Sequence, residues 1–188
     1  MLKDILDSAV GEILGKGVPI IGISVTESTL LREAREKTGD RIARAWEEYL
    51  QGYYVGDIDM ALTDSFGLDG MVIEKDIDFS SLCMHHFMPF YGTVDIIYLP
   101  NKHVCGLSKL SRVVDKYAKR FQLQESLGKS IATDLGASIK PEWVIVRINS
   151  KHTCVGCRGV NKSRASLTTI HSWGLDAMEA AEVCRNVL

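Results

Sequence analysis

The sequence lacks a long apolar run, and this excludes a membrane-spanning helix, which needs about 20 consecutive apolar residues. Its first residues, MLKDILDSAVGEILGKG, break up their apolar positions with acids, a pattern that predicts no signal peptide. A strong excess of charge is also missing. The formal net charge is −2, so no overall field attracts nucleic acid or acidic lipid. Any anionic ligand must therefore be held by a local group of basic side chains.

The chain has few cysteines, and their number is odd. The five cysteines are Cys83, Cys105, Cys154, Cys157 and Cys184. An odd count without an export signal argues against a disulfide framework and favours a reducing cytoplasm. There the cysteines are expected to be buried apolar side chains or metal ligands. Cys105 and Cys184 stand alone in the sequence, and we expect both to be small buried residues.

The first 60 residues are predicted to be helical. Apolar residues recur at helical spacing within 2–14, 27–37 and 41–54. Thr26 and Asp40 are candidate N-caps, and Gly39 is expected to interrupt the helical stretch. With 188 residues, 46% of them hydrophobic and 24% charged, the chain has the composition of a globular domain with an extension.

From about residue 61 the pattern changes to alternating strands and amphipathic helices. Strands are predicted at 71–79, 92–100, 142–150 and 165–173, and a short terminal helix within 174–188. Residues 106–139 carry two successive apolar stripes, which predict a pair of helices. This order indicates an α+β fold in which an antiparallel sheet carries two helices on one face.

Two short stretches, CMHH and KHTCVGCRG, gather most of the good metal ligands of the chain. They contain Cys83, His85, His86, His152, Cys154 and Cys157. Zn²⁺ is the natural ion for mixed thiolate and imidazole ligands. In an extended strand Cys83 and His85 would share one face, whereas in a turn Cys83 and His86 can converge. The spacing alone leaves both arrangements open.

Ordinary interpretations compete with metal binding for each of these residues. Cys154 and Cys157 form a C-x-x-C pair, which often indicates half of a zinc knuckle or a redox pair. The second half of a knuckle is missing, and no clear helix follows the pair as a redox motif would require. His103 and His171 are isolated, and we expect them to be ordinary core or surface residues.

Several motifs in the same order resemble one enzyme family. The stretch SSLCMHHFMPFYGTVDIIYLPNKHVCGLSKLSRVVDKYAKRFQLQESL, followed by KHTCVGCRGV, is similar to GTP cyclohydrolase I. The resemblance runs from about residue 66 to 172. Upstream, TGDRIAR resembles a further family segment, with Gly39 in place of its usual proline and Arg44 in place of its usual lysine.

The resemblance implies a ligand set and a reaction. It assigns Zn²⁺ to Cys83, His86 and Cys154, leaves His85 and His152 for proton transfer, and puts Cys157 outside the ligand shell. Members of the family add water at C8 of the guanine of GTP, release formate and reclose the ring to give 7,8-dihydroneopterin triphosphate. Three protein ligands leave an open position for water, and imidazoles can move protons near neutral pH.

The resemblance also implies how GTP is held. A carboxylate can accept hydrogen bonds from both guanine N1–H and the 2-amino group, and the family pattern places Glu125 there beside Gln124. The residues that resemble a triphosphate cradle are Ser108, Lys109, Arg112 and Arg158, with Arg41 and Arg44 adding to the pocket. Positive charge that is local in this way fits a chain whose net charge is slightly negative.

The family's fold is the tunnelling fold, in which sheets of several subunits close into a barrel and the active sites lie between subunits. The resemblance therefore implies a homo-oligomer, a decamer of two pentameric rings. We expect residues 1–60 to form a helical extension and 61–188 the catalytic domain. The expected ligand is GTP, with no nucleic acid or membrane partner, in the cytoplasm.

One departure from the family pattern keeps alternatives open. Met84 stands where a glutamate is usual between the cysteine and the histidine pair. Its loss favours, as an alternative, a variant cyclohydrolase that acts on a related purine triphosphate or stops at an intermediate. A non-catalytic oligomer stapled by zinc is a second alternative. A third is the nitrile reductase of the deazapurine route, against which the GLSK and KHTCVGCRG segments argue.

Overall fold

The computed structural model describes residues 4–5, 7–9, 12, 29–67 and 69–188. It divides into two compact units, residues 1–48 and 49–188, which are described separately. In the first unit, residues 4–5, 7–9 and 12 are helical, and the rest of the helix expected at 2–14 lies outside the described residues. Thr26, the predicted N-cap, also lies outside them.

Helix α2 (Thr29–Tyr49) contradicts the interruption expected at Gly39, because it runs through that residue without a break. A glycine inside a helix costs only about 1 kcal/mol relative to alanine, so it weakens a helix without ending it. The absence of a side chain has a use here, because a Cβ at Gly39 would collide with the carboxylate of Asp7. Asp40 therefore lies within one long helix and does not cap a second one.

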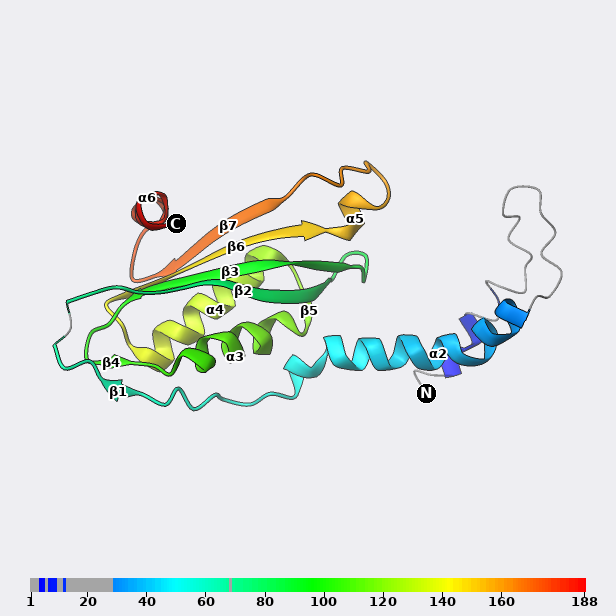
Figure 1. Ribbon diagram of the computed structural model, residues 1–188, viewed down its shortest axis with the longest axis horizontal. Coiled ribbons are helices and arrows are strands. Elements are labelled where there is room, and N and C mark those ends of the chain that lie inside the picture. The colour runs from blue at the N-terminus through cyan, green and yellow to red at the C-terminus, as the bar shows by residue number, and fades with distance from the viewer. Residues whose placement is uncertain (1–3, 6, 10–11, 13–28, 68) are drawn as a thin grey trace. The chain divides into compact units, whose positions relative to one another are not determined.

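The second unit is built on a five-stranded sheet with the order β5-β2-β3-β6-β7 (Figure 1). Its strands are β2 (Val72–Cys83), β3 (Pro89–Leu99), β5 (Phe121–Gln122), β6 (Trp143–His152) and β7 (Leu167–Trp173). The four long strands pair antiparallel, which confirms the prediction, while the two-residue β5 runs parallel to β2. Alternation along β6 directs Val144, Val146 and Ile148 to one buried face.

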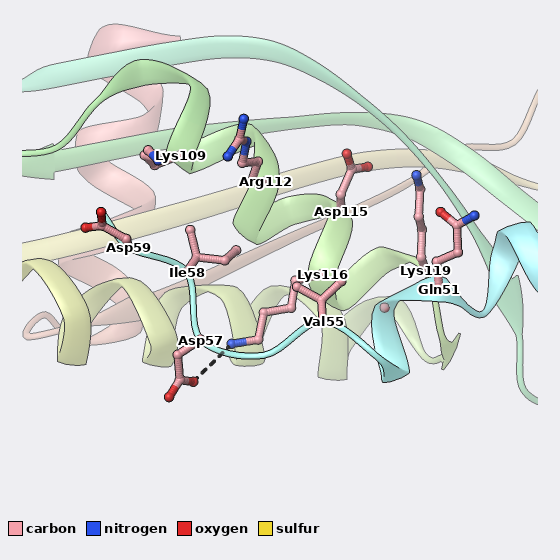
Figure 2. Close-up of a pocket in the computed structure, with 11 residues that line it drawn as sticks. Gln51, Val55, Asp57, Ile58, Asp59, Lys109, Arg112, Asp115, Lys116 and Lys119 are labelled. Atoms are coloured by element: carbon pink, nitrogen blue, oxygen red, sulfur yellow. Dashed lines mark ion pairs between the residues drawn. The ribbon is translucent and has the colours of Figure 1, made fainter. Parts of the chain in front are cut away.

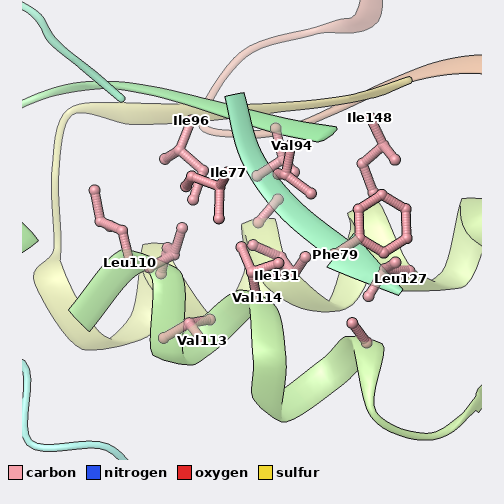
Figure 3. Packing of buried hydrophobic residues seen from close by; sticks show 14 of the residues in the cluster. Ile77, Phe79, Val94, Ile96, Leu110, Val113, Val114, Leu127, Ile131 and Ile148 are labelled. Atoms are coloured by element: carbon pink, nitrogen blue, oxygen red, sulfur yellow. The ribbon is translucent and has the colours of Figure 1, made fainter. Parts of the chain in front are cut away.

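Helices α3 (Leu107–Ala118) and α4 (Gln124–Ile139) cover that face of the sheet, as the two apolar stripes predict. Leu110 and Val114 of α3 and Ile131 of α4 are fully buried in one core with strand residues such as Val94 and Ile148 (Figure 3). Burying each such side chain contributes about 1.5–3 kcal/mol. The helix pair is thereby fixed on the sheet along its whole length.

The C-terminal helix α6 (Ala177–Val187) lies on the opposite face of the sheet (Figure 1). Its Ala180 and Cys184 are buried against Ile97 and Ile145, whose side chains alternate away from the main core. The helix begins with a capping box in which Asp176 accepts hydrogen bonds from the Met178 and Glu179 backbone. The expected terminal helix is confirmed. Helices α3 and α4 are the two helices expected on one face, and α6 adds a helix on the other face, because the outward alternation of β3 and β6 creates a second apolar patch.

A bulge in β2, between Glu74 and Ile77, adds curl to the sheet. Asp76 takes a positive φ of 57° there, and its N–H donates to Asp95 Oδ1 at 2.9 Å. The other carboxylate oxygen of Asp95 accepts from Arg147 Nε at 2.8 Å. This half-buried ion pair, together with the Asp76 N–H, joins three strands on the face opposite α3 and α4.

Five short elements, β5 among them, are additions to the predicted order. The 3-10 helix η1 (Gln51–Tyr53) follows α2, and β1 (Thr63–Asp64) pairs antiparallel with β4 (His103–Val104). Helix α5 (Thr153–Gly156) follows β6 directly. The N–H of Gly52 donates to Lys119 O at 2.9 Å, and Arg120 Nη2 donates to Gly52 O at 2.8 Å, so η1 is anchored to the C-terminal end of α3. Within the described residues no helix combines the length and the apolar character that crossing a membrane requires.

Candidate active site

The turn between β2 and β3 brings Cys83 and His86 together. Cys83 is the last residue of β2, and the N–H groups of His86 and Phe87 both donate to Cys83 O. This reversal places Cys83 Sγ and His86 Nδ1 3.9 Å apart. Because the chain turns immediately after Cys83, the arrangement in which Cys83 and His85 share a strand face does not occur.

Helix α5 supplies a third ligand. It starts directly after His152, and Thr153 Oγ1 donates to Pro89 O at 2.6 Å, which ties α5 to the start of β3. The ligand atoms of Cys83, His86 and Cys154 all lie within 4.8 Å of one another, a group that could hold a metal ion. Burial raises the pKa of the Cys154 thiol, the neighbouring Cys83 raises it further, and Arg158 lowers it.

Three residues near this group remain outside it. His85 is exposed in the turn, with its ring centroid 6.2 Å from that of His86. Cys157 is exposed at the end of α5. Met84, the departure from the family pattern, is 49% exposed beside the same turn. The group formed by Cys83, His86 and Cys154 is called the metal cluster below.

His152, at the end of β6, is held beside the metal cluster by two contacts. Its ring stacks on the buried ring of Phe90, with centroids 4.7 Å apart and an interplanar angle of 4°. Its Nδ1 lies 3.4 Å from Ser150 Oγ. Burial lowers the pKa of the imidazole, and Glu125 opposes that shift. The ring itself is half buried.

Gln124 and Glu125 begin α4 and have different surroundings. Gln124 is 1% exposed, and its amide bonds only atoms of this chain: Ser150, Thr169 and the carbonyls of Ile148 and Leu167. Glu125 is exposed and influences the pKa of both His152 and His171. His171, on β7, packs against Gly128 of α4, and burial lowers the pKa of the His171 imidazole.

The residues expected to hold the triphosphate lie mostly at the other end of the sheet. Lys109 and Arg112 line a hollow of about 430 Å³ between α3 and residues 51–59 (Figure 2). Ser111, between them, donates to Glu74 Oε1 at 3.3 Å, and Glu74 precedes Cys83 by nine residues of β2. At 3.3 Å per residue, the distance along β2 from Glu74 to Cys83 is roughly 25–30 Å. One chain therefore does not bring these residues to its own metal cluster.

The remaining expected anion ligands are spread out as well. Ser108 is exposed in the first turn of α3, and Arg158 is exposed after α5, near Cys154. Arg41 and Arg44 are exposed in α2, three residues apart and so on neighbouring turns, within the first compact unit.

Sequence reasoning missed Ser150 and Phe90, which both contact the His152 ring. A signal for Ser150 was available, since residues two apart in a strand share a face and Ser150 precedes His152 by two. Phe90 is positioned by pairing between strands, because its register partner is His152. The isolated cysteines agree with expectation, since Cys105 and Cys184 are buried.

Comparisons with known proteins agree with these motifs. The family model of GTP cyclohydrolase I matches residues 21–186. A GTP cyclohydrolase 1 of Finegoldia magna is 46% identical over 140 residues, which are 73% of this chain and 76% of that protein. A GTP cyclohydrolase 1 of Rickettsia felis is 37% identical over 149 residues, 78% of each chain.

The likeness to a solved structure is weaker. The crystal structure of the archaeosine synthase QueF-Like in the apo form aligns with a TM-score of 0.45 and 20% identity, over 56% of this chain and 95% of that one. The family match covers most of the sequence and includes every residue of the metal cluster. On this evidence the chain belongs to the GTP cyclohydrolase I family.

Proposed function

We propose that this protein is a zinc-dependent GTP cyclohydrolase that opens the imidazole ring of GTP at C8, releases formate and forms 7,8-dihydroneopterin triphosphate. The observation that carries the proposal is the convergence of Cys83, His86 and Cys154 from two separate parts of the chain. Membership of the family supports the same conclusion, since both relatives described above are named GTP cyclohydrolase 1.

The donor set of the metal cluster fits zinc. Zn–S bonds of about 2.3 Å and Zn–N bonds of about 2.0–2.1 Å in a tetrahedron separate the ligand atoms by roughly 3.3–3.8 Å. Cys83 Sγ and His86 Nδ1 are 3.9 Å apart, close to that range. When bound, the ion would supply Lewis-acid activation of water, as three-ligand zinc sites do.

The two histidines outside the cluster are proposed to move protons. C8 of a purine is a poor electrophile until N7 is protonated, and His152 is the group we assign to N7. Its half-accessible ring and lowered pKa suit an acid–base group at neutral pH. His85, exposed in the turn, is assigned to proton transfer at the ribose or at water.

Guanine recognition is assigned to the first turn of α4. The Glu125 carboxylate can accept hydrogen bonds from N1–H and the 2-amino group, a pair of donors that adenine does not offer. Because the side chain of Gln124 is used internally, its backbone N–H is the group that it can offer to a ligand. The first N–H groups of a helix have no partner within the helix.

Triphosphate binding is proposed to require a second copy of the chain. Ser108, Lys109 and Arg112 begin α3, roughly 25–30 Å from the metal cluster of their own chain. A neighbouring copy would bring its α3 to the cluster, where Arg158 already stands, and Arg41 and Arg44 are assigned to the same anion site. Five basic side chains beside a polyanion form charge-assisted hydrogen bonds.

The proposed assembly is a decamer of two pentameric rings in which the sheets close into a barrel. Strands β5 and β7 end the described sheet, and β7 has no strand on its outer side within the described residues. An exposed sheet edge is a template for pairing with another chain. The catalytic domain proposed for residues 61–188 and the cytoplasmic location stay predictions.

One assay tests the function. The purified protein is incubated with GTP or ATP, with and without a zinc chelator, while formate and the fluorescent oxidised pterin are measured. We expect equal amounts of both products from GTP, neither from ATP, and loss of turnover on chelation that zinc restores. Absence of both products from GTP with the zinc-loaded protein would overturn the proposal.

Met84 gives one specific reason to keep a second candidate, a variant cyclohydrolase. Its exposed thioether replaces a carboxylate beside the metal cluster, which changes the charge available to an intermediate. Formate without a pterin in the same assay would favour this variant.

A further inference from the structure

The buried amide of Gln124 has a fixed orientation. Its Nε2 lies 3.2 Å from Ile148 O, 3.0 Å from Leu167 O and 3.2 Å from Thr169 Oγ1. Backbone carbonyls only accept hydrogen bonds, so the NH₂ group must face them and Oε1 must face the other way. Exchanging the two amide atoms would place oxygen against two carbonyl oxygens in a dry site.

This orientation fixes the hydroxyl proton of Ser150. Ser150 Oγ lies 2.6 Å from Gln124 Oε1, an atom that carries no hydrogen. The serine must therefore be the donor in this short bond. Only the lone pairs of Ser150 Oγ remain for its second neighbour, His152 Nδ1, at 3.4 Å.

A serine that can only accept determines which nitrogen of the neighbouring imidazole bears the proton. We propose that Ser150, oriented by Gln124, is a positioning residue that holds neutral His152 as the Nδ1–H tautomer, so that Nε2 is the nitrogen that takes up a proton from water and, as the imidazolium, delivers it to the substrate. The Phe90 ring, stacked at 4.7 Å, fixes the plane of the imidazole. The Ser150 contact is made at Nδ1, and among the described residues no hydrogen bond from this chain reaches Nε2.

The role in turnover rests on the proposed function, whereas the tautomer itself does not. The chain Gln124–Ser150–His152 is built from two elements, the start of α4 and the end of β6, which also carry Glu125 and adjoin α5. It explains why the side chain of Gln124, next to the expected guanine ligand Glu125, forms all its hydrogen bonds inside the protein. The role proposed for this chain of hydrogen bonds is to determine which nitrogen of His152 carries the proton.

The tautomer is measured directly by magic-angle-spinning NMR of the zinc-loaded protein with ¹⁵N-labelled histidine at about pH 8, where the ring is neutral. The His152 signals are those lost in His152→Ala. We expect protonated Nδ1 and bare Nε2 in the parent and in Ser150→Thr, and a shift toward Nε2–H in Ser150→Ala. Ser150→Cys, with a weaker acceptor of nearly the same shape, gives the same test if Ser150→Ala does not fold.

Kinetics with GTP provide a second readout. Ser150→Ala should lower kcat about tenfold and change KM by less than about twofold, with Ser150→Thr recovering most of the loss. Ser81→Ala is the matched control. Ser81 is also fully buried on the helix-covered face, and its hydroxyl donates to Arg120 O, not to a histidine.

An unchanged His152 tautomer in Ser150→Ala, or an equal fall of kcat in Ser81→Ala, would overturn the proposal. Full turnover by His152→Ala would instead overturn the acid–base role in the proposed function, and the NMR result would still decide the tautomer. The two failures are thereby distinguishable.

Discussion

The two ends of the sheet differ in chemistry. At one end, where β2 turns into β3, sulfur and imidazole side chains converge within 4.8 Å and His152 stands half buried beside them. At the other end, where α3 begins, Lys109 and Arg112 line an open hollow. The first end carries metal-ligating side chains, the second carries basic side chains beside Asp57, Asp59 and Asp115, and roughly 25–30 Å of strand separates them.

Because of this separation, the proposed function requires one reaction to be distributed over two copies of the chain. The rigid sheet and the α3–α4 pair keep each end in shape, but they also prevent the ends of one chain from meeting. If both ends act on GTP, substitutions at the two ends should have kinetically different effects, and substitutions between them should affect stability alone.

The largest effect is expected at the metal cluster. Cys154→Ala removes one of three ligands and should abolish zinc retention and lower turnover more than about a thousandfold. Metal analysis and formate release measure both. Cys157→Ala, three residues on and exposed, is the control and should retain metal and turnover. Loss of metal from Cys157→Ala, or a fully active Cys154→Ala, would show that the cluster is assigned wrongly.

A smaller effect is expected for His152→Ala, because general acid–base catalysis contributes about 10²- to 10⁴-fold. The kcat for GTP should fall by that factor while zinc content stays at one ion per chain. His103→Ala, an exposed histidine of β4, serves as the control. If His152→Ala retains its zinc, its assembly and its turnover, the result would favour a zinc ion with a purely structural role.

At the other end, Arg112→Ala should act mainly on KM. A hydrogen bond to a charged group contributes about 1.5–3 kcal/mol, equivalent to a rise in KM of about 10- to 100-fold. Steady-state kinetics over a range of GTP concentrations separate this from an effect on kcat. Arg185→Ala, on α6 at the opposite face of the sheet, should leave KM unchanged. An unchanged KM in Arg112→Ala would remove this end from the site.

Much of this comparison follows from the sequence, and some of it does not. The stripe through Leu110 and Val114 and the alternation of Val144 and Val146 predict α3 and β6, because burial of one face dominates their stability. The same patterns do not say that α2 continues through Gly39 or that α6 covers the second face, since both depend on tertiary contacts.

The metal cluster shows the same division. Residue types in CMHH and KHTCVGCRG indicate zinc chemistry, but their spacing leaves His85 and His86 open. The resemblance implies His86, and the turn after Cys83 brings that residue to Cys83. The Gln124–Ser150–His152 chain could not be predicted, because it depends on how α4 sits against β6.

The smallest effect on GTP kinetics is expected between the two ends. Lys116 is buried in α3 and donates to Asp134 Oδ2 of α4 at 3.1 Å. Lys116→Met leaves that carboxylate with fewer donors and should lower the free energy of unfolding by about 1–3 kcal/mol. Chemical denaturation measures this, and kcat should not change at a temperature where the variant is folded. Lys116 also lines the hollow of Lys109 and Arg112, so KM is not part of this test.

The same pair predicts an acid dependence of stability. Burial raises the pKa of Asp134, but hydrogen bonds from Lys116, Tyr117 and Ser138 outweigh it and hold that pKa below 3.8. A carboxyl whose folded pKa is depressed stabilises the protein above the unfolded pKa, and this contribution is lost as pH falls below about 4. Denaturation between about pH 5 and 3 should therefore show a smaller loss of stability in Lys116→Met than in the parent. Equal slopes would mean that the pair does not perturb Asp134.

Mixing the two ends is the most direct test of whether they act together across copies. His152→Ala and Arg112→Glu chains, each nearly inactive alone at low GTP, are co-expressed with different tags, and mixed oligomers are isolated through both tags. Random assembly pairs an intact metal end with an intact α3 from a neighbour at about a quarter of the sites, so about a quarter of the parent turnover is predicted. Mixed oligomers that bind zinc but gain no turnover over the separate variants would contradict a site shared between copies.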